Sequence, residues 1–186
     1  MGKNKKMMKE VTTLDAAFSM GCDEIGSLAE EMGEWRDNMS GTNLESTSKY
    51  EDVDETASSL ENIHGNLEGQ EMPNVMQSWP VEYSYIRPYG KKPMSRYDRS
   101  SMACSALQAI TDTFQIILDA LEEKREGITE GNRSPDESLL LVLDADQIKD
   151  LDDEALEKLG DEIKDIQSEI EDAISELENV EFPGFY

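Results

Sequence analysis

Apolar residues recur at seven-residue spacing in three stretches of this chain, and this periodicity constrains its fold more than any other feature. It is clearest between about 153 and 180, where more than half of the positions outside the apolar series carry Asp or Glu. Seven-residue spacing places apolar side chains along one face of an α-helix, and helices pack side by side through such faces. We therefore expect long helices joined by narrow apolar contacts. The stripe of this last helix consists of Leu156, Leu159, Ile163, Ile166, Ile170, Ala173, Leu177 and Val180.

The same spacing predicts a first helix over about 12–39. A capping box at Ser48 and Glu51 predicts the start of a second helix, because each side chain can satisfy a free amide of the first turn. The short connection between the two helices favours an antiparallel hairpin. Gly21 lies on the apolar stripe, where it would allow a neighbouring helix to approach closely. The two apolar series of the first helix are Val11, Phe18, Ile25, Met32 and Met39, and Leu14, Gly21, Leu28 and Trp35.

A third helix is expected over 101–126, with the widest apolar face of the chain. A Ser-Pro-Asp-Glu start at 134–137 then predicts a short buried helix over 139–143. Between the hairpins, four prolines within 69–100 exclude a long helix. Val81–Ile86 alternates like a short strand, but no partner strand is evident from the pattern.

The predicted fold class is all-α: antiparallel helical hairpins forming a coiled-coil-like bundle with a long Pro/Tyr-rich connecting segment. The expected parts are a basic N-terminal arm (1–10), a helical hairpin (11–68), the Pro/Tyr-rich linker (69–100), a second hairpin with an acidic C-terminal helix (101–181) and an aromatic tail (182–186). The tail is expected either to dock on the bundle or to act as a hook for a partner.

The net charge of −25 restricts the classes of partner. Such a chain repels nucleic acid and anionic membranes, so we expect a protein partner with a basic surface, and no direct binding of nucleic acid or membrane. Residues 1–10 and 82–101 are two basic islands, each with a net charge of +3. We expect them to pair with the acidic helices of the chain itself. The alternative is that the second island, with its tyrosines, grips a phosphate backbone.

Cysteine usage and the N-terminal sequence favour the cytoplasm. Cys22 and Cys104 lie far apart and lack the spacing of a disulfide framework or a metal site. Residues 11–20 are too polar for the apolar part of an export signal. The longest apolar run, 139–143, is far shorter than a membrane span.

Metal and catalytic signatures are weak, so we expect no cofactor, no metal and no enzymatic activity. The acidic run 144–155 fails as a calcium loop, because Lys149 replaces the required Gly and Ala155 the closing Glu. Glu61 and His64 have the Glu-x-x-His spacing of di-iron bundles. Since His64 is the only histidine in the chain, a two-metal site would require a second chain and further carboxylates such as Glu30, Glu31 or Glu34.

The acidic face of the last helix is the predicted partner-binding surface. A rod of carboxylates could also imitate the phosphates of duplex DNA, which presents one charge per ~1.7 Å of axis. The alternative is that these charges have no specific partner and only keep the protein soluble. The same helix could join two copies as a homodimer. The residues of this face are Asp153, Glu154, Glu157, Asp161, Glu162, Asp165, Glu169, Asp172 and Glu176.

One short segment resembles bacteriophage and prophage proteins of uncharacterised function: Glu34-Trp35-Arg36-Asp37-Asn38-Met39 and the following Leu44-Glu45-Ser46-Thr47-Ser48-Lys49-Tyr50-Glu51. The resemblance implies the cytoplasm of a bacterial host or association with a virion, and it assigns no residue a role. The expected function is a non-enzymatic acidic helical interaction protein, such as a phage accessory or virion component. The alternatives are a DNA-mimic inhibitor of a host DNA-binding protein and a di-metal carboxylate protein assembled across a dimer.

Overall fold

A computed structural model describes residues 5–88, 92–125, 148 and 151–184. In chain order, the elements are β1 (Lys5–Thr13), α1 (Leu14–Met39), α2 (Ser48–Glu68), β2 (Pro80–Pro88), α3 (Arg96–Arg125) and α6 (Asp153–Glu178). Four of these six described elements are helices. The short helix predicted over 139–143 lies outside the described residues.

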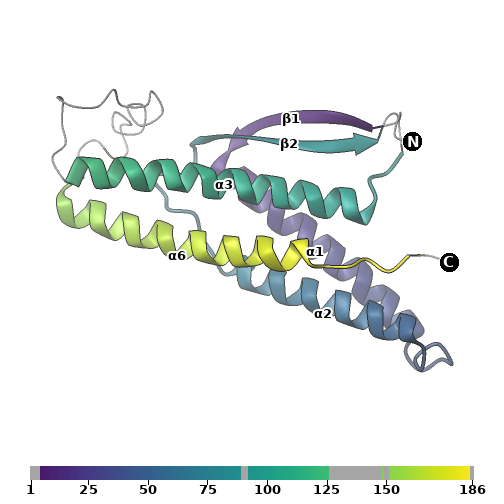
Figure 1. The fold of residues 1–186 in the computed structure, drawn as a ribbon. Coiled ribbons are helices and arrows are strands. Elements are labelled where there is room, and N and C mark those ends of the chain that lie inside the picture. The colour runs from purple at the N-terminus through teal and green to yellow at the C-terminus, as the bar shows by residue number, and fades with distance from the viewer. Residues whose placement is uncertain (1–4, 89–91, 126–147, 149–150, 185–186) are drawn as a thin grey trace.

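The helices form the two expected hairpins. In Figure 1, α1 lies beside α2 and α3 beside α6, and α1 also packs on α3. The predicted helices over 12–39 and 153–180 agree with α1 and α6 to within two residues. The second helix does begin at Ser48, but its cap is Thr47, whose hydroxyl accepts a hydrogen bond from the Tyr50 amide at 3.3 Å. The prediction of a Ser48 capping box is therefore wrong by one position.

A two-stranded antiparallel sheet corrects the all-α prediction. The expected strand at Val81–Ile86 extends over Pro80–Pro88, and its partner is β1, paired from Lys5 opposite Pro88 to Thr13 opposite Pro80. Residues 5–10 of the basic N-terminal arm therefore belong to a strand, and so does Val11, which was assigned to the first helical hairpin. Residues 1–4 of the arm lie outside the described residues. The paired residues are 67 to 83 positions apart in the chain, so their pairing leaves no local periodicity, and the lysines of β1 obscure its alternation. The fold is mostly helical, with this sheet added.

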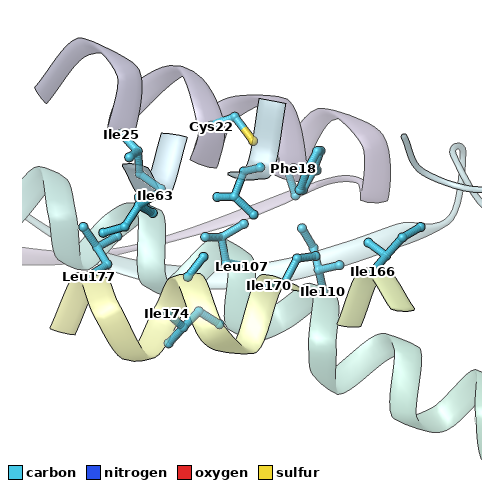
Figure 2. Packing of buried hydrophobic residues seen from close by; sticks show 14 of the residues in the cluster. Phe18, Cys22, Ile25, Ile63, Leu107, Ile110, Ile166, Ile170, Ile174 and Leu177 are labelled. Carbon is cyan, nitrogen blue, oxygen red and sulfur yellow. The ribbon is translucent and has the colours of Figure 1, made fainter. Parts of the chain in front are cut away.

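The apolar stripes of the helices meet in one core. All eight stripe positions predicted for α6 are buried, and Figure 2 shows side chains of α6 facing those of α1, α2 and α3. At Gly21, an added Cβ would lie 3.1 Å from Cδ2 of Leu107, so the expected close approach between helices occurs there. Complete burial of each large apolar side chain contributes about 1.5–3 kcal/mol, which makes this core the main stabilising feature.

The segment that follows α6 docks on the two hairpins. The Thr56 hydroxyl donates to the Glu181 carbonyl at 2.8 Å, and Lys49 Nζ donates to the Gly184 carbonyl at 2.7 Å. Phe182 meets Tyr97 of α3 edge to face, with ring centroids 5.7 Å apart. The tail prediction is thus resolved as docking for Phe182, whereas Phe185 and Tyr186 lie outside the described residues.

Candidate functional site: an acidic groove between α3 and α6

A groove of about 420 Å³ runs between α3 and α6, on the side of α6 adjacent to its buried stripe. Gly160 helps to form it, because glycine has no side chain to fill the space between the helices. A Cβ added at this position would lie 4.0 Å from Cδ2 of Leu118. Its apolar lining comes from both helices, through Leu118, Leu121 and Leu156. The polar lining consists of Gln115, Asp119, Glu122, Glu157, Asp161, Lys164, Gln167, Ser168 and Glu171.

Carboxylates outnumber cations along this groove. Of its described lining residues, Lys164 is the only basic one, against five acidic side chains. Asp119 accepts a hydrogen bond from the Gln115 amide at 2.7 Å, and Glu171 accepts one from Gln167 at 2.8 Å. Amide donors are neutral, so they orient these carboxylates without cancelling their charge. The groove therefore combines an apolar base with oriented negative charge on both sides.

The nine residues predicted to bind a partner are all exposed on α6. The structure places two of them, Glu157 and Asp161, in the groove. The other seven lie on α6 outside its lining, and Glu162 forms an exposed ion pair with Lys158 at 3.6 Å. Exposed pairs of this kind contribute little, ~0.3–0.5 kcal/mol, so the face remains strongly acidic.

The α3 side of the groove, namely Asp119 and Glu122, was not predicted from the sequence. No local pattern specifies which face of α3 adjoins α6, because that choice depends on how the two stripes pack. One usable signal was Gly160, a glycine interrupting an acidic heptad helix beside the stripe residue Leu159.

Two arginines of the second basic island pair with acids of α1, as expected. Lys5 and Lys9 of the first island pair instead with Asp98 and Glu82, which lie within the second island. Arg96 contacts Glu31 at 2.7 Å, and Arg99 contacts both Glu31, at 2.8 Å, and Glu24. Partial burial raises the pKa of Glu31, but the hydrogen bonds and charges of the two arginines outweigh it and hold that pKa below its usual value. These arginines are engaged across the α1–α3 contact, which disfavours their use as a phosphate grip. Lys91, another cation of the second island, lies outside the described residues.

The residues considered for a metal site contact separate partners. The Glu61 carboxylate accepts a hydrogen bond from Arg36 at 3.0 Å and lies beside Gly33. The His64 ring lies against Gly26, about 10 Å away from Gly33 along α1. Within the described part of the chain, no three His, Cys, Asp or Glu side chains are grouped so that they could hold a metal ion.

The cysteines are placed as small apolar residues. Burial raises the pKa of both Cys22 and Cys104 to about 11, so both thiols are protonated at neutral pH. Cys22 and His64 line a second hollow of about 470 Å³ between α1 and α2. A protonated thiol is a poor nucleophile and a poor metal ligand, so this hollow does not resemble a cysteine-based active site.

Comparisons with known proteins identify no relative: no protein-family model, curated protein or solved structure matches this chain. Among the helices that the structure describes, none combines the length and the apolar character needed to cross a bilayer.

Proposed function

We propose that this protein is a non-enzymatic interaction protein that holds a basic segment of a protein partner in the groove between α3 and α6. The observation that supports this proposal is the combination of an apolar base with carboxylates on both sides, oriented by neutral amides. An amphipathic helix binds such a groove with its apolar side chains on the base. Its Lys and Arg side chains lay their aliphatic stems on the apolar surface and direct their charged ends to the carboxylates.

The test compares two triple variants with the same change in net charge. The groove variant carries Asp119→Asn, Asp161→Asn and Glu171→Gln. The control carries Asp52→Asn, Glu55→Gln and Glu68→Gln, which neutralise exposed acids on α2 outside this groove. Partners captured from a bacterial host lysate by the wild type are identified and then measured individually against each variant.

The groove variant is expected to weaken binding of the identified partner at least tenfold, while the control binds like the wild type. Affinity should also fall as salt rises from about 0.05 to about 0.3 M, because exposed charges are screened beyond a few ångströms at the higher salt. Equal losses in both variants would show that only overall charge matters, and the groove proposal would then fail.

DNA mimicry is the second candidate, and the charge density of α6 favours it. Eleven carboxylates lie within Asp153–Glu178, against two lysines. With a rise of ~1.5 Å per residue, this is about one carboxylate per 3.5 Å of helix, close to the ~3.4 Å between phosphates along one DNA strand. A mimic binds through the outward face of α6 rather than through the groove.

Competition with duplex DNA separates the two functions. A mimic should displace DNA from a host DNA-binding protein, and Asp165→Lys, Glu169→Lys and Asp172→Lys on α6 should abolish this effect while the groove variant retains it. A phage setting, proposed from the resemblance of residues 34–51, is tested separately by searching purified virions and infected cells for the protein. No displacement of DNA from any tested host protein would remove mimicry.

A further inference from the structure

The free edge of β1 is the feature that neither the core nor the groove uses. Within the described residues, β1 pairs only with β2, and Figure 1 shows it on the side of β2 away from α3. β2 rests on α3 and has Pro80 and Pro88 at its ends. Proline lacks an amide hydrogen, so it blunts a strand edge, whereas β1 contains neither proline nor glycine over nine residues. An unblunted edge of this length is a template for another strand.

Apolar side chains accompany this edge. Met7 and Ile86 face each other across the sheet, with 67% and 47% of their surface exposed, and Val11 is 68% exposed. Odd-numbered residues of β1 share the outer face of the sheet, because side chains alternate along a strand. The side chains of Met7 and Val11 are therefore exposed to water, on a strand whose edge is also unpaired within the described residues.

The charges of β1 indicate which occupant fits. Lys5 is bound to Asp98 and Lys9 to Glu82, each at 2.6 Å. The remaining charges are Lys6 and Glu10, one of each sign, on the opposite face of the sheet from Met7. Lys6 lies opposite Arg87 of β2, so that end is positive, while Glu10 lies opposite Tyr83, whose phenol donates a hydrogen bond to the Glu10 carboxylate. An acidic foreign strand would satisfy only one end of this arrangement.

We propose that the edge of β1 pairs with β1 of a second copy of this chain, antiparallel about a two-fold axis at Met8, to form a four-stranded sheet. In this register Lys6 faces Glu10 of the second copy at both ends, and the two Met8 side chains meet at the axis. Met7 lies diagonal to Val11 of the second copy, within reach across an antiparallel pair. The charge pattern of β1 is therefore complementary to its own reverse.

Complementary charge variants test this register. Lys6→Glu places two glutamates opposite each other, and Glu10→Lys places two lysines opposite each other, so each variant alone should weaken self-association about tenfold. An equimolar mixture of the two variants restores opposite charges at both ends of a mixed dimer and should recover the wild-type association. Sedimentation equilibrium from about 1 μM to about 1 mM measures this, and recovery in the mixture also shows that both variants fold.

A cross-linking pair gives a second measurement. Met8→Cys should form an inter-chain disulfide rapidly with diamide, which is reduced as the two thiols are oxidised. Leu44→Cys, in the α1–α2 loop, is more exposed and should react more slowly if the pairing is specific.

Two outcomes overturn the proposal. One is a wild type that remains monomeric over the whole concentration range. The other is a dimer that neither charge variant weakens, which would place self-association on another face such as α6. The groove variant should leave the dimer intact, so the outcome is independent of the proposed partner binding.

Discussion

The imidazole of His64 lies directly against the backbone of Gly26, at a position where an added Cβ would come within 2.7 Å of Nε2. This contact joins α2, near its C-terminal end, to the middle of α1. It gives the only histidine of the chain a packing role that depends on a glycine one helix away. Predictions about this pair and about three other contacts follow from the same kind of geometry.

Gly26→Ala should raise the free energy of unfolding less than the matched substitution Gly65→Ala. Alanine in a helix interior is favoured over glycine by about 1 kcal/mol, and nothing lies within 4 Å of a Cβ at Gly65. At position 26 the new methyl group must displace the imidazole, which cancels this gain. Urea unfolding measures both variants. His64→Ala in the Gly26→Ala background should restore the gain, and simple additivity of the two substitutions would contradict the proposed contact.

Glu31→Gln should remove a stabilising contribution that depends on pH. The folded-state pKa of Glu31 is lowered by Arg96 and Arg99, so its contribution is complete above the ordinary carboxyl pKa and disappears as pH falls through the lowered value. Because the side chain is partly exposed, we expect only about 0.5–1 kcal/mol at neutral pH. The difference in unfolding free energy between wild type and Glu31→Gln should vanish in strong acid. Glu30→Gln, an exposed neighbour, is the control and should show almost no difference at either pH.

Thr56→Val should loosen the segment after α6. The substitution keeps the shape of the buried side chain but removes the hydroxyl that donates to the Glu181 carbonyl at 2.8 Å. Loss of that hydrogen bond should cost about 1–2 kcal/mol and speed amide exchange around residues 179–184. Thr56→Ser retains the hydroxyl, so it should preserve slow exchange. Equal exchange rates in both variants would mean that this contact does not hold the segment in place.

Tyr83 should ionise at unusually high pH. Burial raises its pKa to about 12, and the neighbouring Glu10 adds to the effect. Since the protonated phenol is favoured in the folded state, the stability it contributes is complete below the ordinary tyrosine pKa and is lost as pH rises through about 12. Difference absorbance of the wild type and Tyr83→Phe during alkaline titration isolates this group. A Tyr83 signal at the ordinary tyrosine pKa would show that β2 does not pack on α3 in solution.

Local periodicity was sufficient for the helices. The α6 stripe from Leu156 to Leu177 alternates so regularly with acids that only one face of the helix can be buried, and all of it is. The apolar stripe predicted for the first helix agrees with α1 from Leu14 onward. It was wrong at Val11, which fits the seven-residue spacing but belongs to β1. The pairing of Arg96 and Arg99 with acids was also predictable, because isolated cations in a strongly acidic chain find carboxylates nearby.

The helices, their buried faces and the strongly acidic surface could therefore be predicted from local sequence, since all three depend on neighbours within a few residues along the chain. The pairing of β1 with β2, and the placement of Asp119 of α3 and Asp161 of α6 in one groove, became visible only in the folded chain. These arrangements join residues far apart in the chain, and their energy depends on how whole faces pack together. No short window of sequence contains that information.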